Sequence, residues 1–161
     1  MTTWILGHRG LLVEGRWLPC TIGRGGKTSD KREGDMASPR GLWTVTGLLY
    51  RPDRMARPAP WAQPILPGDL WSDDPARAEY NCPVRAPYAG SHEELRRADP
   101  LYDLVMITDW NAEAVPGKGS AIFLHQWRRP GYPTAGCLAF RRDRARWLAE
   151  RARPGTMIRV G

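Results

Sequence analysis

Two segments in the last third of the chain decide which fold and chemistry the sequence predicts: they read Gly119-Ser120-Ala121-Ile122-Phe123-Leu124-His125 and Pro133-Thr134-Ala135-Gly136-Cys137-Leu138-Ala139-Phe140. The first is an apolar run that ends in His125, and Cys137 follows 12 residues later, directly after a glycine. This pattern indicates a thiol nucleophile that lies beside its base at the end of a strand. A base is needed because the thiolate, not the thiol, attacks carbonyl carbons, and a neighbouring imidazole favours the thiolate near neutral pH.

The remaining sequence predicts a mainly β architecture of mixed sheets, with long loops and a few short helices. Alternating β-branched and aromatic residues predict short strands within residues 3–23 and further strands at residues 42–50, 104–108, 121–125 and 156–160. Residues 51–90 are rich in proline and aromatic residues. Such a segment forms either an insertion over a cleft or a clamped surface loop.

Helix signals occur in two places. At residues 91–97, Ser91 stands three residues before Glu94, which is typical of a capping box. Residues 142–153 are rich in helix formers. Their predicted inward positions are Ala145, Trp147, Leu148 and Ala152.

The composition is that of a folded chain with room for one domain. The sequence has 161 residues, of which 42% are hydrophobic, and it contains 17 Gly and 15 Pro. The hydrophobic fraction argues against disorder, and the many glycines and prolines favour short strands joined by turns. We expect a single domain over residues 1–161 and a monomeric protein.

The net charge is +7, and Lys27, Lys31 and Lys118 are the only lysines among the 24 basic residues. An excess of arginine can reflect genome composition, or it can serve to bind carboxylates or an acidic polymer, which guanidinium groups grip through two hydrogen bonds. The sequence contains no basic helix, aromatic RNA-binding pattern or zinc-finger spacing, so we do not expect nucleic acid as a partner.

Cys20, Cys82 and Cys137 are widely separated, which does not match the spacing of a zinc site. Their odd number leaves at least one free thiol, which we assign to Cys137. Cys20 and Cys82 are then either two buried thiols or a disulfide pair. No apolar run approaches the roughly 20 residues that span a bilayer. The first residues read as a strand and turn, with no recognisable signal peptide.

Three segments give the chain a resemblance to the YkuD-type L,D-transpeptidase catalytic domain, a family of bacterial peptidoglycan enzymes. Residues 31–43, KREGDMASPRGLW, resemble a family loop in which Lys, Glu-Gly-Asp, Thr-Pro, Gly and an aromatic residue follow in order. Phe123-Leu124-His125 is similar to the family's strand that ends in histidine, and Thr134-Ala135-Gly136-Cys137 stands where the family has Ser/Thr-His-Gly-Cys. The three segments lie in the family's order within residues 27–140.

The resemblance implies a YkuD-like β-sandwich and an enzyme that crosslinks peptidoglycan stem peptides, with no cofactor and no metal. Cys137 would be the nucleophile that forms a thioester with a donor stem peptide. His125 would be the general acid and base for the leaving amine and then for the acceptor amine. The backbone N–H groups of Gly136 and Cys137 would stabilise the oxyanion. In this family a backbone carbonyl or a small polar side chain orients the histidine, and the sequence does not single out that group.

The carboxylates of the stem peptides suggest arginine partners beside the catalytic residues. The candidate substrate-binding residues are Arg128, Arg129, Trp127, Arg141, Thr134 and Tyr50. The same substrate implies a periplasmic location, although no export signal is visible in the sequence.

Three features differ from the better-known members of the family. Ala135 takes the place of a histidine, Ala139 takes the place of an asparagine or arginine, and the spacing of 12 residues between His125 and Cys137 is shorter. These features resemble small, single-domain proteobacterial branches. One such branch links the first residue of one stem peptide to the third of another, instead of joining two third residues. Both types of crosslink stay open.

Two other functions also stay open. The same thiol can pass its acyl group to water, which would make the protein an L,D-carboxypeptidase or a hydrolase of peptidoglycan-linked peptides. The acceptor depends on how well the site excludes water, which the sequence does not reveal. The alanine at position 135 also gives weight to a non-catalytic cell-wall-binding module.

Overall fold

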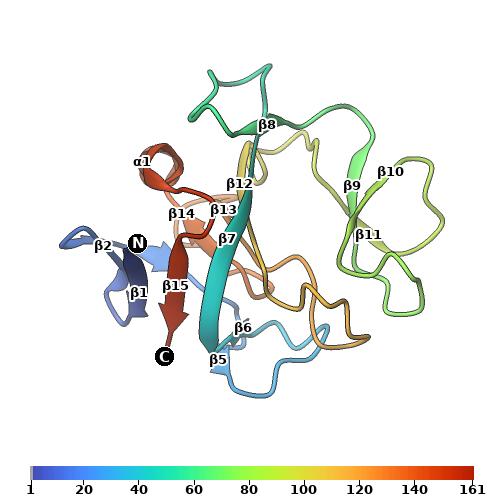
Figure 1. Ribbon diagram of the computed structural model, residues 1–161, viewed down its shortest axis with the longest axis horizontal. Coiled ribbons are helices and arrows are strands. Elements are labelled where there is room, and N and C mark those ends of the chain that lie inside the picture. Colours follow the sequence, from blue (N-terminus) through green and yellow to red (C-terminus); the bar gives the residue numbers. More distant parts are fainter. Residues whose placement is uncertain (1) are drawn as a thin grey trace.

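The fold, seen in a computed structural model that describes residues 2–161, consists mainly of β-strands (Figure 1). A large mixed sheet has the strand order β3-β2-β1-β15-β7-β12-β13-β14-β4, and β8 pairs with β7 outside this path. These strands are β1 (Thr3–Gly7), β2 (Gly10–Val13), β3 (Arg16–Leu18), β4 (Cys20–Thr21), β7 (Gly41–Tyr50), β8 (Gln63–Pro64), β12 (Leu104–Thr108), β13 (Phe123–Gln126), β14 (Leu138–Phe140) and β15 (Met157–Val160). Because β4 at one edge also lies against β2 near the other, the sheet is nearly closed. The predicted mainly β fold with mixed sheets is confirmed.

Two small sheets and one helix complete the architecture of residues 2–161. The first small sheet joins β10 (Pro83–Arg85), β9 (Asp69–Ser72) and β11 (His92–Glu94), all within the segment that connects β7 to β12. The second joins β5 (Lys27–Thr28) to β6 (Ser38–Pro39) in parallel. The helix is α1 (Arg142–Arg151). In Figure 1 the β9–β11 sheet lies on the opposite side of β7 from β1 and β2.

The longest strand, β7, crosses the middle of the molecule and shifts its pattern of burial along its length. Its buried apolar side chains are Trp43, Val45, Leu48 and Tyr50. The step from odd to even positions coincides with an irregular register between β7 and β12, where Gly47 lies opposite Ile107. A Cβ on Gly47 would come within 2.8 Å of the Ile107 side chain, so glycine permits this bulge. The bulge lets both halves of β7 contribute to the core.

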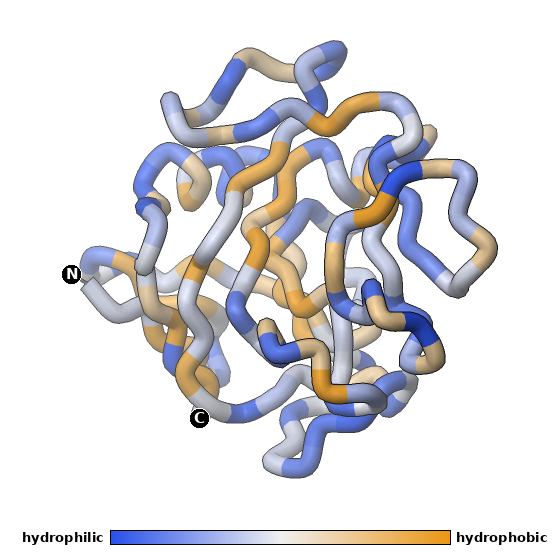
Figure 2. The backbone as a smooth tube through the Cα atoms, turned by 45° about the vertical axis from the view of Figure 1, so that its right-hand side comes forward, coloured by the Kyte–Doolittle hydropathy of each residue, from blue (hydrophilic) through white to orange (hydrophobic). Residues whose placement is uncertain are grey.

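Helix α1 covers one face of the central strands, packing against β12, β13 and β14. Ala145, Leu148 and Ala152 are fully buried as expected, whereas Trp147 is half-buried, with the Arg151 guanidinium 3.7 Å from its ring centroid. The helix predicted for residues 142–153 is therefore confirmed over most of its length. The hydropathy colouring of Figure 2 shows the apolar segments gathered in the central strands, where this core lies.

The helix predicted at residues 91–97 is wrong, because His92–Glu94 forms strand β11. Glu93 pairs with Trp71 and Glu94 pairs with Leu70 of β9. The capping signal of Ser91 and Glu94 is a local preference, and sheet pairing within the inserted segment outweighs it.

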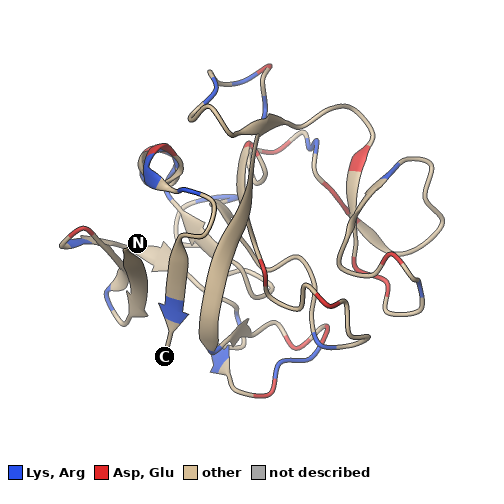
Figure 3. Ribbon diagram, in the orientation of Figure 1, with Lys and Arg blue, Asp and Glu red and all other residues tan. Residues whose placement is uncertain are grey.

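Outside the sheets, the loops carry most of the charged residues, as Figure 3 shows by the blue and red segments around largely tan strands. No helix within residues 2–161 has the length and apolar character needed to cross a membrane. Cys20, Cys82 and Cys137 are all free thiols.

Candidate active site

A cavity of about 270 Å³ opens between strands β13 and β14 of the large sheet and the inserted β9–β11 sheet. Cys137 and His125 both line it. Strands β13 and β14 are parallel, and His125 pairs with Ala139, two residues beyond Cys137. Because side chains two residues apart share one face of a strand, the thiol and the imidazole lie on the same side of the sheet. The fold therefore brings together the two side chains that the sequence analysis placed at the centre of the site.

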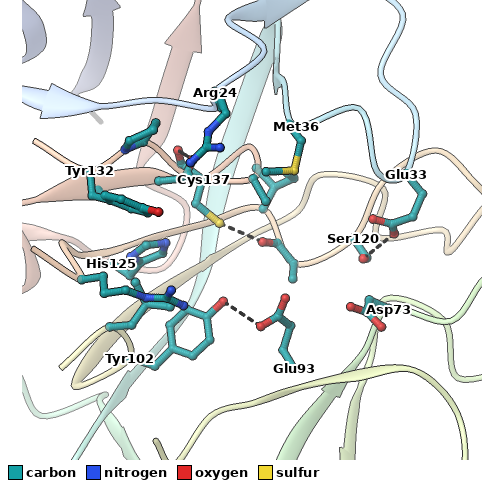
Figure 4. A pocket seen from close by; sticks show the side chains of 18 of the residues that line it. Arg24, Glu33, Met36, Asp73, Glu93, Tyr102, Ser120, His125, Tyr132 and Cys137 are labelled. Carbon is teal, nitrogen blue, oxygen red and sulfur yellow. Dashed lines mark hydrogen bonds between the residues drawn. The ribbon is translucent and has the colours of Figure 1, made fainter. Parts of the chain in front are cut away.

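The Cys137 thiol is held by backbone groups of the segment that leads into β13. Its Sγ donates to the Ala121 carbonyl at 3.0 Å, the bond dashed in Figure 4, and accepts a hydrogen bond from the Phe123 N–H at 3.3 Å. The residue is only 7% exposed. Burial raises the pKa of the Cys137 thiol to about 12, so this structure holds the neutral thiol.

His125 is buried and oriented by the carbonyl of the next residue. Its Nδ1 lies 2.7 Å from the Gln126 carbonyl oxygen, and the Tyr102 ring packs edge-on against the imidazole at a centroid distance of 5.3 Å. Burial lowers the pKa of His125 to about 4, so the imidazole is neutral. A neutral imidazole must donate from Nδ1 to bond a carbonyl, which leaves Nε2 as the proton acceptor. The Gln126 carbonyl is thus the orienting group that the sequence did not single out.

The thiol and the imidazole are not an ion pair in this structure. Within residues 2–161, no hydrogen bond joins Cys137 to His125, and burial shifts the pKa values of the two groups in opposite directions, so both rest uncharged. The thiolate that the sequence analysis expected from pairing with His125 is therefore absent from the resting arrangement.

The turn before Cys137 depends on Gly136. This residue has φ +141°, and a Cβ there would lie 2.8 Å from the Ala37 carbonyl oxygen. The Gly136 carbonyl accepts a hydrogen bond from the buried Ser38 hydroxyl at 2.7 Å, and the Gly136 N–H donates to Thr134 Oγ1 at 3.0 Å. Glycine is required here by both backbone conformation and space. The Gly136 N–H, one of the two expected oxyanion donors, is occupied by Thr134 in this arrangement.

The walls of the cavity carry charges of both signs. The cationic side chains that line it are Arg24, Lys31, Arg97 and Arg128. The carboxylates that line it are Glu33, Asp73 and Glu93. In Figure 4 Arg24 and Tyr132 lie on one side of Cys137, and the three carboxylates lie on the other. Such an arrangement suits a ligand that has both carboxylate and ammonium groups.

The three cavity carboxylates, Glu33, Asp73 and Glu93, form a carboxylate wall and differ in their hydrogen-bond partners. Glu33 accepts hydrogen bonds from the Tyr80 hydroxyl at 2.7 Å and from the Ser120 hydroxyl at 2.6 Å. Burial and then the nearby Asp73 charge raise the pKa of Glu93. Asp73 Oδ1 is buried and has no hydrogen-bond partner among the described residues. Glu33 and Glu93 therefore have hydrogen-bond partners, Glu93 through the Tyr102 hydroxyl, whereas Asp73 Oδ1 has none among the described residues.

Of the six candidate substrate-binding residues, Arg128 and Thr134 line the cavity, whereas the other four do not. Tyr50 is buried in β7 beneath the Arg57 guanidinium. Arg129 lies over the Tyr132 ring at 4.4 Å. Arg141 pairs with Asp143 at the start of α1. Trp127 is half-buried, and its Nε1 has no hydrogen-bond partner among the described residues.

Sequence reasoning missed Tyr102, Asp73 and Glu93, which line the cavity from the segment between β7 and β12. Residues 51–90 did suggest an insertion over a cleft, but no local pattern marks which of its side chains reach the thiol. His8 and His92 are exposed and lie outside this cavity.

A thiol and an imidazole thus line one charged cavity of a mainly β fold, which is the kind of arrangement found in enzymes that use a cysteine nucleophile. The family model described as the L,D-transpeptidase catalytic domain, YkuD, matches residues 3–160, so the chain belongs to this family. Membership implies activity of the L,D-transpeptidase type on peptidoglycan and a place in the cell envelope. A search of curated proteins found no match.

Proposed function

We propose that this protein is a peptidoglycan L,D-transpeptidase in which Cys137 forms a thioester with a donor stem peptide and transfers it to an acceptor amine. The observation that carries the proposal is the position of Cys137 Sγ and His125 in one cavity, on the same face of β13 and β14. The proposal treats residues 1–161 as one catalytic domain. It places the protein in the periplasm, where its substrate lies.

The chemistry follows from two neutral groups. His125 Nε2 takes the thiol proton as Cys137 Sγ attacks the donor carbonyl carbon, so a sulfur–carbon bond forms and the carbonyl becomes an oxyanion. The carbon–nitrogen bond then breaks, and the imidazolium returns the proton to the leaving amine. The acceptor amine gives a proton to His125 and attacks the thioester, and the released sulfur regains a proton. No energy source is needed, because the thioester conserves the energy of the cleaved peptide bond.

Oxyanion stabilisation is assigned to the turn before β14. The Cys137 N–H and the Gly136 N–H belong to this turn, and donors aimed at a developing oxyanion give a large share of the rate enhancement in acyl transfer. Since Thr134 Oγ1 occupies the Gly136 N–H at 3.0 Å, the Thr134 hydroxyl has to turn away before both donors serve the oxyanion. Thr134 therefore belongs to the site as a residue that controls one donor.

Substrate recognition follows from the charged walls. Stem peptides carry the carboxylates of glutamate and diaminopimelate, and the acceptor carries an amine. We assign the carboxylates to the side of Arg24 and Arg128, and the acceptor ammonium to the side of Glu33 and Glu93. A cavity with both signs of charge favours this substrate over a purely acidic polymer.

The second candidate is transfer of the acyl group to water by the same thiol. Its support is that the cavity is open to solvent on the side of exposed Arg128. Incubation of the purified protein with defined muropeptides separates the two reactions. Crosslinked dimers support transfer, and shortened monomers without dimers support an L,D-carboxypeptidase or hydrolase. If dimers form, mass spectrometry of their fragments distinguishes a link between two third residues from a link between a first and a third residue.

A non-catalytic wall-binding module would behave differently in the same assay. It retains binding to peptidoglycan but gives neither dimers nor shortened monomers. Replacement of Cys137 by alanine leaves binding intact in every case and abolishes products only if the protein is an enzyme. Products that persist in Cys137→Ala would reject Cys137 as the nucleophile.

A further inference from the structure

The carbonyl that holds the Cys137 thiol belongs to a residue with an unusual backbone. Ala121 has φ +52°, a left-handed conformation that residues with a Cβ rarely adopt. Gly119, two residues earlier, has φ +99°. This strained turn ends directly before β13 and aims the Ala121 carbonyl at Cys137 Sγ. Strain of this kind persists only where the surroundings fix it.

The surroundings that fix Ala121 come from the inserted segment between β9 and β10. Asn81 Oδ1 accepts a hydrogen bond from the Ala121 N–H at 2.9 Å and another from Trp71 Nε1 at 3.0 Å. Asn81 Nδ2 donates to the Trp110 carbonyl at 3.0 Å and to the Asn111 carbonyl at 2.8 Å. The side-chain amide therefore uses both of its N–H donors and both acceptor positions of its oxygen. Asn81 connects the insertion to the segment that carries the thiol's hydrogen-bond acceptor.

The neighbour of Asn81 holds the same turn from a second point. The Tyr80 hydroxyl accepts a hydrogen bond from the Gly119 N–H at 3.0 Å. It also donates to Glu33, which accepts from Ser120 Oγ. Of the two residues, Asn81 is the one that bonds Ala121, whose carbonyl accepts the hydrogen bond from the thiol.

We propose that Asn81 is a positioning residue of this site: its side chain locks the left-handed Ala121, so that the Ala121 carbonyl holds the thiol proton of Cys137 until substrate enters the cavity. The proposal rests on Cys137 being the nucleophile. A hydrogen bond to the protonated form of an acid opposes its ionisation. The hydrogen bonds from Cys137 to the Ala121 carbonyl and from the Ala121 N–H to Asn81 therefore keep the sulfur neutral and in one orientation at rest. On attack, the S–H bond of Cys137 breaks, the proton passes from Sγ to His125 Nε2 instead of pointing at the Ala121 carbonyl, and the sulfur–carbon bond forms.

Other groups around the thiol also influence its ionisation. Burial raises its pKa most strongly, the Phe123 N–H lowers it, the Glu93 charge raises it and the Lys31 charge lowers it. The titratable and charged residues that share the cavity with Cys137 are Arg24, Lys31, Glu33, Asp73, Glu93, Arg97, Tyr102, His125, Arg128 and Tyr132. Asn81→Gly leaves the charges of all of these unchanged, so it isolates the effect of the Ala121 carbonyl.

The test is the rate of Cys137 alkylation by iodoacetamide across a pH series, read by peptide mass spectrometry so that Cys20 and Cys82 do not contribute. Asn81→Gly is the informative variant, because glycine accepts the φ of +56° at this position and removes only the side chain. We expect the pH midpoint of alkylation to fall by roughly one unit relative to the unsubstituted protein. We expect kcat for transfer to fall with little change in KM. Asn81→Asp retains the oxygen that bonds the Ala121 N–H and adds a negative charge, and both keep the midpoint high, so a fall of the midpoint in this variant would contradict the proposal.

Asp69→Ala is the matched control. Asp69 lies in the same inserted segment, where it accepts a hydrogen bond from the Leu66 N–H and pairs with Arg85, away from Ala121. Its removal should leave the midpoint unchanged. An Asn81→Gly midpoint equal to that of the unsubstituted protein, or an equal shift in Asp69→Ala, overturns the proposal.

A second measurement does not depend on how the variants fold. In the unsubstituted protein the Ala121 amide should exchange its hydrogen as slowly as the amides of β13, and fast exchange at Ala121 overturns the proposal. Alkylation and hydrogen exchange are both measured without substrate. Their results can therefore contradict the role of Asn81 while the transpeptidase assignment stands. Conversely, the muropeptide assay can contradict the transpeptidase assignment while both measurements support the role of Asn81.

Discussion

The Ser38 hydroxyl donates a hydrogen bond of 2.7 Å to the Gly136 carbonyl, across 98 residues of sequence. Ser38 Oγ also accepts from the Gly23 N–H at 2.9 Å, and the side chain is completely buried. One hydroxyl therefore connects β6 and Gly23 to the turn that carries the candidate nucleophile. Ser38, which belongs to the sequence motif at residues 31–43, thus supports the turn before Cys137.

Replacing Ser38 by alanine should lower the free energy of unfolding by about 1–3 kcal/mol, because two buried backbone groups lose their partner. Transfer activity should fall as well, since the turn before Cys137 loses its support. Urea denaturation and the muropeptide assay measure the two effects. Ser91→Ala, at an exposed serine, is the control and should change neither. An unchanged free energy of unfolding in Ser38→Ala would mean that this hydrogen bond does not contribute to the stability of the fold.

Gly136→Ala should be among the most damaging single substitutions in the chain. The added Cβ would lie 2.8 Å from the Ala37 carbonyl oxygen, and the φ of +141° is unfavourable for alanine. We expect a loss of about 2 kcal/mol or more in stability, together with loss of activity. Gly117→Ala is the matched control, because Gly117 has φ +81° with nothing within 4 Å of an added Cβ. Denaturant unfolding of both variants separates backbone strain from steric conflict, and equal losses would argue against a tight turn.

The burial of His125 predicts a specific loss of stability in mild acid. Burial lowers its pKa from 6.5 to about 4, so between these values the unfolded chain binds a proton that the folded protein does not. The stabilising contribution is complete above about pH 6.5 and is lost as the pH falls to about 4, by roughly 1–3 kcal/mol. In His125→Gln, the free energy of unfolding should depend less steeply on pH across this window. A slope that is unchanged in the variant would show that other groups cause it.

Arg128→Ala tests the cationic side of the cavity. Arg128 lines the cavity, its side chain is 49% exposed, and it lies 3.8 Å from Asp99. An exposed charge contact is worth up to about 1 kcal/mol, so KM for the donor stem peptide should rise up to about fivefold with little change in kcat. Arg142→Ala removes an exposed arginine on α1, outside the cavity, and should leave KM as it is. Equal effects of the two substitutions would indicate only the loss of net positive charge.

The sheet strands could be predicted because their signals are local. The alternation at residues 42–50 and the apolar run at residues 104–108 correspond closely to β7 and β12. The strand predicted at residues 121–125 begins two residues later, at Phe123, because Ala121 adopts a left-handed conformation. The Ala121 N–H donates a hydrogen bond to Asn81, 40 residues earlier in the sequence, and no local pattern can reveal such a contact.

The site was predictable only in part for the same reason. His125 and Cys137 stand at strand ends, where a residue's position in the strand fixes the face on which it lies. Arg128 and Arg129 are neighbours of one residue type, yet one lines the cavity and the other lies over Tyr132. Asp73 and Glu93 come from the insertion, whose path depends on tertiary pairing between β9 and β11, and Glu33 comes from the distant loop between β5 and β6. The sequence identified the thiol and the imidazole that line one cavity, but not the side chains that surround them.

The most direct test of the nucleophile is the intact mass of the protein after treatment with a carbapenem, a class of compound that typically acylates the thiol of this family. The account predicts one covalent adduct that peptide mapping places on Cys137, and no adduct in Cys137→Ser. An unmodified folded protein, or an adduct on Cys20 or Cys82 instead, would contradict it.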